Sequence, residues 1–115
     1  MPATSPPEPI RGKYYLYAIR LRDDVLSRPK FRAANPLYRA GKPCYYVGSS
    51  IYRPKVRFRK HLNGERSSKW VRDFGLHVAT RKCKAMFETE PGDRIVAERN
   101  YAEELRAQGY GIWQN

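Results

Sequence analysis

Cysteine, acidic residues and long apolar runs are all scarce in this sequence. Cys44 and Cys83 are too few for a disulfide framework and lack the paired spacing of a zinc site, so we expect two reduced thiols. No stretch approaches the roughly 18 consecutive apolar residues of a membrane span. Residues 1–12 lack the apolar core of a secretory signal, and we expect them to form a disordered leader. These absences favour a cytoplasmic protein with no membrane partner.

Acidic side chains are far outnumbered by basic ones. The 115 residues include 23 Lys and Arg against 11 Asp and Glu, a formal net charge of +12. Such an excess is self-repelling unless a polyanion is near, and nucleic acid is the commonest polyanion for a basic domain. We therefore expect DNA as the partner and a nucleoid or DNA-associated location, although charge alone does not distinguish DNA from RNA. The length fits a single domain over residues 13–115. We expect this domain to act as a monomer or a weak dimer.

Aromatic and β-branched residues mark the predicted strands. Residues 13–21 and 44–48 are rich in strand formers, and the second run ends at a glycine. The basic segment between them contains three prolines and predicts a long loop with a turn of helix in it. Residues 76–80 and 82–88 resemble two short strands or one interrupted strand.

Proline, serine and glycine signals mark three helices. Pro54 can open a helix that ends at Asn63-Gly64. Ser67-Ser68 can cap a short second helix, and the last helix begins at Asp93, its predicted N-cap, and ends before Gly109. The order of elements predicts an α+β fold, with a small, mainly antiparallel three-stranded sheet flanked by helices.

A carboxylate lies in the apolar stripe of the last predicted helix. Glu98 shares one helical face with the apolar positions of that stripe, which are Ile95, Tyr101, Ala102 and Leu105. An inward-facing carboxylate costs several kcal/mol or more unless a cation meets it. The pattern therefore predicts a metal ion or a basic partner there, and a structural salt bridge to an arginine is the alternative.

Two tyrosine-rich motifs and a set of polar residues follow one another in a recognisable order. Tyr15-Leu16-Tyr17 and Tyr45-Tyr46-Val47-Gly48-Ser49 fall in the two predicted strands. Arg57 and His61 follow at i, i+4 spacing, Glu98 lies in the last helix, and Asn115 ends the sequence. Over roughly residues 13–115 this arrangement resembles the GIY-YIG nuclease superfamily, as a small standalone catalytic domain.

The resemblance implies a metal-dependent endonuclease that hydrolyses DNA phosphodiester bonds, one strand per active site. Glu98 would hold Mg²⁺ or Mn²⁺, hard ions that prefer oxygen ligands. Tyr17 would be the general base, with Tyr15 as the nearest rival. Tyr46 and His61 would hydrogen-bond to the base.

The remaining implied roles concern the phosphate and the closure of the site. Arg57 would grip a phosphate through its planar fork, and Asn115 would tie the site together. Without the resemblance, an arginine such as Arg57 is usually a solvated surface charge, and a histidine such as His61 is more often structural.

Basic residues outside this set predict a surface that tracks phosphates. Sequence preference would come from the long loop or from a separate targeting protein. A non-catalytic nucleic-acid-binding module is the alternative function, because it explains the charge and the aromatic residues equally well. The predicted nucleic-acid contacts are Arg32, Arg39, Lys42, Arg53, Lys55, Lys60, Lys69 and Arg72.

Overall fold

Two long antiparallel strands form the centre of the sheet. The computed structural model describes residues 8–114. Strand β1 (Lys13–Leu21) pairs with β2 (Cys44–Ser50), with Tyr17 opposite Gly48. The predicted first strand is confirmed, and the second extends two residues beyond its predicted end at Gly48.

The sheet is mixed and has five strands within residues 8–114. Four of them follow the order β3-β1-β2-β5, and the fifth, β4, pairs with β1. β3 (Gly75–Val78) and β4 (Lys84–Phe87) both pair antiparallel with β1, at opposite ends of the same edge. β5 (Gly111–Gln114) pairs in parallel with β2. The α+β class is confirmed, but the expected count of three strands is wrong.

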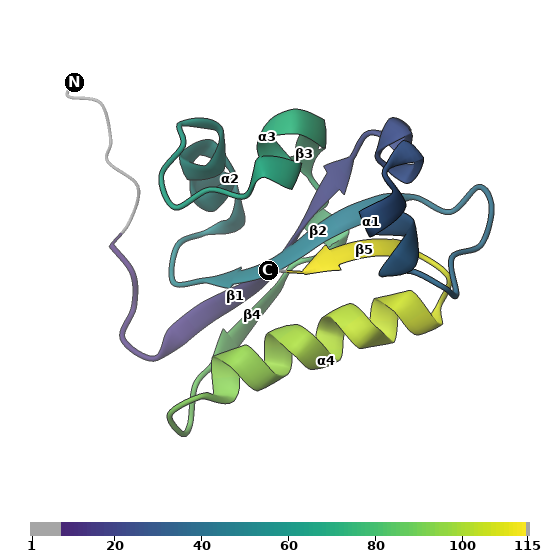
Figure 1. Ribbon diagram of the computed structural model, residues 1–115. Helices are drawn as coiled ribbons and strands as arrows, with labels where there is room; N and C mark the ends of the chain where they lie inside the picture. Colours follow the sequence, from purple (N-terminus) through teal and green to yellow (C-terminus); the bar gives the residue numbers. More distant parts are fainter. Residues whose placement is uncertain (1–7, 115) are drawn as a thin grey trace.

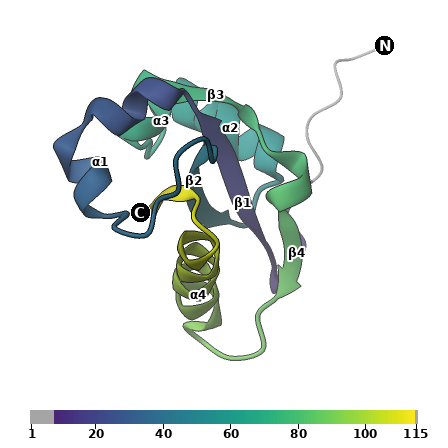
Figure 2. The ribbon, with the colours of Figure 1, turned by 90° about the vertical axis from the view of Figure 1, so that its right-hand side faces the viewer.

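Helices cover both faces of this sheet. Figure 1 shows α4 along one face and α2 and α3 over the other, and the turned view in Figure 2 agrees. The loop between β1 and β2 contains two short helical segments, where a single turn of helix was predicted. Among residues 8–114, no helix is both long and apolar enough to cross a bilayer. The helical segments are η1 (Asp23–Ser27), α1 (Pro29–Ala33), α2 (Pro54–Leu62), α3 (Lys69–Phe74), η2 (Thr80–Lys82) and α4 (Asp93–Ala107).

Strand β1 is buried on both faces, so its alternating side chains serve two separate cores. Leu16 and Ala18 pack with Tyr101 and Leu105 on the α4 side. Tyr17, Ile19 and Leu21 pack on the opposite side with residues from α1 and α3. Because side chains alternate along a strand, a shift of one residue would exchange the two cores. The register of β1 therefore decides that Tyr17 faces α2 and α3.

The predicted helix ends are mostly confirmed. α2 ends at Leu62 with Asn63 as its C-cap, and Gly64 adopts φ +81°, a left-handed conformation that favours glycine. Ser68 caps α3 by accepting from the Trp70 N–H. The predicted cap at Asp93 is wrong, because Gly92 holds the N-cap position. The Asp93 carboxylate instead accepts the backbone N–H groups of the loop just before the helix.

The parallel strand β5 is held by a side chain from the long loop. Asn35 is 5% exposed, and its amide bonds both the N–H (2.7 Å) and the C=O (3.0 Å) of Ile112. Its nitrogen also donates to the Phe31 carbonyl at 2.8 Å. The Asn35 side chain thus takes the place of a further strand along this part of β5.

Replacing Asn35 should weaken the fold measurably. Asn35→Ala leaves the buried Ile112 N–H without its partner, whereas the Ile112 C=O keeps a hydrogen bond from the Arg106 guanidinium at 3.1 Å. Because one unsatisfied buried group costs about 1–3 kcal/mol, we expect the free energy of unfolding to fall by about 1–3 kcal/mol in urea titrations. The control Asn100→Ala, on the exposed side of α4, should change it by less than about 0.5 kcal/mol. Equal effects of the two substitutions would contradict this role of Asn35.

Candidate active site

A buried hydrogen bond joins the first strand to the second helix. The Tyr17 hydroxyl oxygen lies 2.8 Å from His61 Nε2, and the two residues are 2% and 1% exposed. Tyr17 comes from the middle of β1 and His61 from the last turn of α2. The resemblance placed these two residues in one site, and the structure brings them into direct contact.

The other ring nitrogen of His61 determines the direction of that bond. The backbone N–H of Ser68 donates to His61 Nδ1 at 3.0 Å. Since an N–H can only donate, Nδ1 is unprotonated, and the neutral ring must hold its proton on Nε2. The Tyr17 oxygen therefore accepts a hydrogen bond from His61. The Tyr17 hydroxyl proton is therefore not used in the bond to His61. If Tyr17 loses that proton, the His61 Nε2–H remains as a donor to the phenolate oxygen.

Tyr46 completes a cluster of three rings. Its register partner is Ile19, so it lies diagonally across from Tyr17 on the same face of the sheet. The Tyr17 and Tyr46 ring centroids are 6.2 Å apart, and the Tyr46 ring meets His61 edge-on at 5.4 Å. The two tyrosines are therefore neighbours across the central hairpin.

The glycine that ends the second motif makes room for the Tyr17 hydroxyl. A Cβ atom at Gly48 would lie 2.4 Å from the Tyr17 oxygen, far inside contact distance. Tyr15 points to the same face but pairs with Ser50, and the Lys13 ammonium lies 5.4 Å above its ring. Of the two rival tyrosines, Tyr17 is the one that the structure places against His61.

Burial keeps the three rings neutral at neutral pH. It raises the pKa of Tyr17 far above its ordinary value, and the Tyr46 phenol reinforces the rise. It raises the pKa of Tyr46 to about 12, reinforced by the Glu98 carboxylate. Burial, together with the charges of Arg57 and Arg72, lowers the pKa of His61 to about 4. The Arg57 charge lowers the pKa of both phenols and so favours their ionised forms.

Arg57 lies on α2, one turn before His61, and part of its fork is already used. Its two terminal nitrogens donate to the carbonyls of Glu65 (3.1 Å) and Arg66 (2.8 Å) in the loop after the helix. A guanidinium has five N–H donors, so donors remain for a further acceptor. The Arg57 side chain is half-buried, so it is not the solvated surface charge that is usual for an arginine.

Glu98 is half-buried and bonded to two polar side chains. The Ser49 hydroxyl donates to its Oε2 at 2.7 Å, and the Gln114 amide nitrogen lies 3.5 Å from Oε1. Ile95, expected on the same buried stripe, is 61% exposed, so the stripe is apolar and buried only from Tyr101 onward. Within residues 8–114, no lysine or arginine forms an ion pair with Glu98, so the salt-bridge alternative is wrong for this part of the chain.

Glu98 and the two phenols lie on opposite faces of the sheet. Its partner Ser49 is on the same face of β2 as Tyr45 and Val47, which face α4. Tyr17 and Tyr46 face the other side of the sheet. In the described chain, the pairing of β5 with β2 stops at Val47, and β2 runs on to Ser50. The Glu98 charge nevertheless raises the pKa of both phenols. The structure therefore brings Tyr17, Tyr46 and His61 together on one face and leaves Glu98, with Ser49, on the face that meets α4.

The donor set at Glu98 suits a loosely held hard cation. Among residues 8–114, no three His, Cys, Asp or Glu side chains are grouped as a closed metal centre would require. The carboxylate of Glu98, the Ser49 hydroxyl and the Gln114 amide are all oxygen-bearing groups, which fit Mg²⁺ or Mn²⁺ with several retained waters. Asn115, the expected closing residue, lies outside the described residues.

The predicted nucleic-acid contacts divide between two ends of β2. Arg39 and Lys42 lie beside the start of β2, where Arg39 packs on Gly109 and the Lys42 ammonium is 4.7 Å from the Tyr110 ring centroid. Seven residues of β2, about 20 Å, separate them from the start of α2. Arg32 lies on α1, where it donates to a backbone carbonyl. Those at or near α2 and α3 are Arg53, Lys55, Lys60, Lys69 and Arg72.

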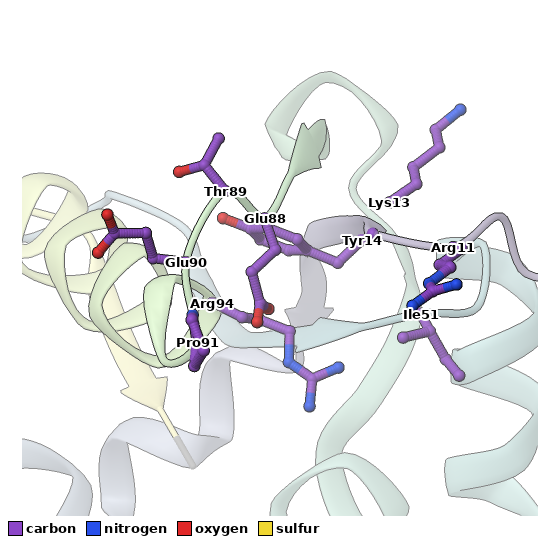
Figure 3. A pocket seen from close by; sticks show the side chains of 10 residues that line it. Arg11, Lys13, Tyr14, Ile51, Glu88, Thr89, Glu90, Pro91 and Arg94 are labelled. Carbon is purple, nitrogen blue, oxygen red and sulfur yellow. The ribbon is translucent and has the colours of Figure 1, made fainter.

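A cavity at one end of the sheet contains none of the candidate catalytic residues. It measures about 360 Å³ and lies between the start of β1 and the loop leading into α4 (Figure 3). Its walls mix the cations Arg11 and Arg94 with the carboxylates of Glu88 and Glu90. The opposing charges give this cavity no clear preference for a phosphate.

Three supporting residues were not assigned to the site from the sequence. Ser49 could have been found from alternation, because it follows Tyr45 and Val47 on the face that meets the last helix. Gln114 could not, because its position depends on the unexpected strand β5. Ser68 was predicted as a helix cap, and its second role as the partner of His61 Nδ1 has no sequence signal.

Comparison of the chain with protein-family models, with curated proteins and with solved structures finds no match.

The buried, neutral imidazole should make the protein sensitive to mild acid. The pKa of His61 is about 4 in the folded chain and about 6.5 when it is exposed, so the unfolded chain binds an extra proton between these values. The free energy of unfolding should therefore fall by up to about 3 kcal/mol as the pH drops from 6.5 to 4. The lowered carboxyl pKa values of Asp24 and Asp93 affect stability only at lower pH.

Chemical denaturation across this pH range tests the assignment. His61→Gln should flatten the acid dependence, whereas His77→Gln, at an exposed position on β3, should retain it. A parent protein whose stability does not change between pH 6.5 and 4 would show that His61 is not held in its neutral form.

Proposed function

We propose that this chain is a metal-dependent endonuclease of the GIY-YIG type, hydrolysing DNA phosphodiester bonds one strand at a time. The observation that supports this best is the hydrogen bond from His61 Nε2 to the Tyr17 phenol, directed by the Ser68 N–H. A phenol that receives a hydrogen bond from a neutral imidazole is prepared to lose its proton, because the donor stabilises the phenolate.

The protein alone does not make Tyr17 a base at neutral pH. Burial and Glu98 raise the phenol pKa, while Arg57 lowers it. A cation beside Glu98 would cancel the unfavourable charge. The oxygen-bearing groups of Glu98, Ser49 and Gln114 would hold Mg²⁺ or Mn²⁺, which when bound supplies positive charge for the phenolate and for the leaving oxygen.

In the proposed reaction, the Tyr17 phenol first gives its proton to solvent. The phenolate then takes a proton from the attacking water while the water oxygen bonds to phosphorus, which restores the phenol. His61 Nε2–H stays bonded to the phenol oxygen and keeps it oriented. Arg57 donates its unused N–H groups to the phosphate oxygens as negative charge builds on them. The bond from phosphorus to the leaving oxygen breaks, and that oxygen takes a proton from solvent. One such site cuts one bond, so a double-strand break requires two visits or two chains.

A non-catalytic nucleic-acid-binding module is the second candidate function, and the burial of the two tyrosines favours it. Tyr17 and Tyr46 are each only 2% exposed, so in this form they pack as core residues. The half-buried Arg57 and Glu98 are the members of the site that a phosphate would meet first. A binding module would show salt-sensitive DNA binding with no metal-dependent cleavage.

Plasmid nicking tests the enzyme proposal. The parent protein should convert supercoiled plasmid to the open circle with Mg²⁺ or Mn²⁺ and lose this activity in EDTA. Glu98→Gln removes the charge that would hold the cation, so nicking should fall at least about 100-fold, in line with the loss of several kcal/mol of charge stabilisation.

The matched control lies on the same helix. Glu104→Gln removes an equal charge at an exposed position of α4 and should nick as the parent does. Circular dichroism should show both variants folded. Undiminished nicking by a folded Glu98→Gln variant would disprove the proposed metal site, and a parent that binds DNA without nicking it would favour the binding module.

A further inference from the structure

A second cavity lies beside α3, on the side of the sheet that holds the tyrosine cluster. It measures about 290 Å³ and is bordered by the start of α1 and by α3. It shares no lining residue with the candidate active site. Its lining residues are Arg28, Lys30, Lys69, Trp70, Asp73 and Phe74.

Aromatic rings form one wall of this cavity and are held firmly from behind. The Trp70 and Phe74 rings stack with their centroids 6.1 Å apart and 27° between their planes. Trp113 of β5 packs against Trp70 at 4.5 Å, and Phe31 of α1 lies 5.9 Å from it. Because three other rings hold Trp70 in place, its remaining surface is a rigid apolar platform at the cavity.

Positive charge surrounds the platform. The Arg28 guanidinium lies 5.5 Å from the centre of the Phe74 ring, and Lys30 and Lys69 are exposed at the rim. Among the described residues, none of these three cations forms an ion pair, and Asp73 is the single carboxylate of the lining. A planar group with phosphates on either side matches this combination of aromatic surface and free cations.

A single short helix connects this cavity to the candidate active site. Ser68, at the N-cap of α3, donates its N–H to His61, and its hydroxyl accepts from the Trp70 N–H at 3.2 Å. The cavity lining therefore begins at Lys69, the residue directly after the group that orients His61. A strand whose phosphate lies at Arg57 and Tyr17 could place a neighbouring nucleotide here.

We propose that this cavity is a subsite for an unpaired nucleotide of the substrate strand, an inference that rests on the proposed nuclease function. The base stacks on Trp70, and the flanking phosphates meet Lys30 and Lys69. A base inside a duplex is already stacked on its neighbours and cannot enter the cavity without unpairing. The subsite therefore selects single-stranded or locally opened DNA over intact duplex.

Tryptophan fluorescence tests the stacking directly. In Trp113→Phe, Trp70 is the only tryptophan, and saturating oligothymidylate in EDTA should quench its emission strongly. A blunt duplex of the same length should quench it far less. In Trp70→Phe, the remaining Trp113 should respond weakly to either DNA. Equal quenching of Trp70 by the two DNAs, or stronger quenching of Trp113 than of Trp70, would overturn the assignment.

A pair of double variants separates the subsite from general charge attraction. Lys30→Ala/Lys69→Ala should bind oligothymidylate about tenfold more weakly than the parent. Arg81→Ala/Arg99→Ala removes the same charge at exposed positions elsewhere and should stay within about twofold of the parent. Equal losses in the two variants would overturn the subsite.

Binding in EDTA and nicking with metal report on different claims. A parent that nicks plasmid but shows no Trp70 quenching retains the nuclease function and loses the subsite. A parent that shows the quenching and the charge-specific loss, but never nicks, retains the nucleotide-binding cavity and loses the proposed catalysis.

Discussion

The position of His61 between Ser68 and Tyr17 is the constraint on which the candidate site depends. One imidazole accepts a backbone N–H from the start of α3 and, as a result, must donate to the phenol of β1. Three elements thereby fix the orientation of one ring and one hydroxyl. Gly48 contributes because it has no side chain, and a side chain there would displace the Tyr17 oxygen. If the ring were free to turn, Tyr17 would be an ordinary buried tyrosine.

The electrostatics of the site disfavour the phenolate that the proposed reaction requires. Burial opposes charge on all three rings, and the half-buried Glu98 further disfavours a phenolate on either tyrosine. Arg57 offsets part of this effect but is partly engaged with backbone carbonyls. A divalent ion beside the carboxylate would reverse the sign of the local field and allow the phenol to ionise. The same carboxylate that suppresses the base would then hold the ion that activates it.

Local signals predicted the central hairpin and α2 well, whereas long-range contacts were beyond reach of the sequence. Aromatic strand formers marked β1 and β2, and Pro54 with Asn63-Gly64 marked both ends of α2. Strand β5 was missed because four residues, Gly-Ile-Trp-Gln, show no clear alternation and depend on Asn35, far away in sequence. The helical period correctly predicted that Glu98 faces the sheet. It wrongly predicted that Ile95 is buried, because periodicity does not reveal where the covering sheet ends.

Nitrogen-15 NMR of the His61 ring tests the central claim most directly, because it observes the proton on which the account depends. At neutral pH the account predicts a neutral ring with the proton on Nε2 and an unprotonated Nδ1, unchanged as the pH is lowered toward 5. A ring protonated on Nδ1, or an imidazolium at neutral pH, would contradict it, because Tyr17 would then lack the directed donor that the proposed chemistry requires.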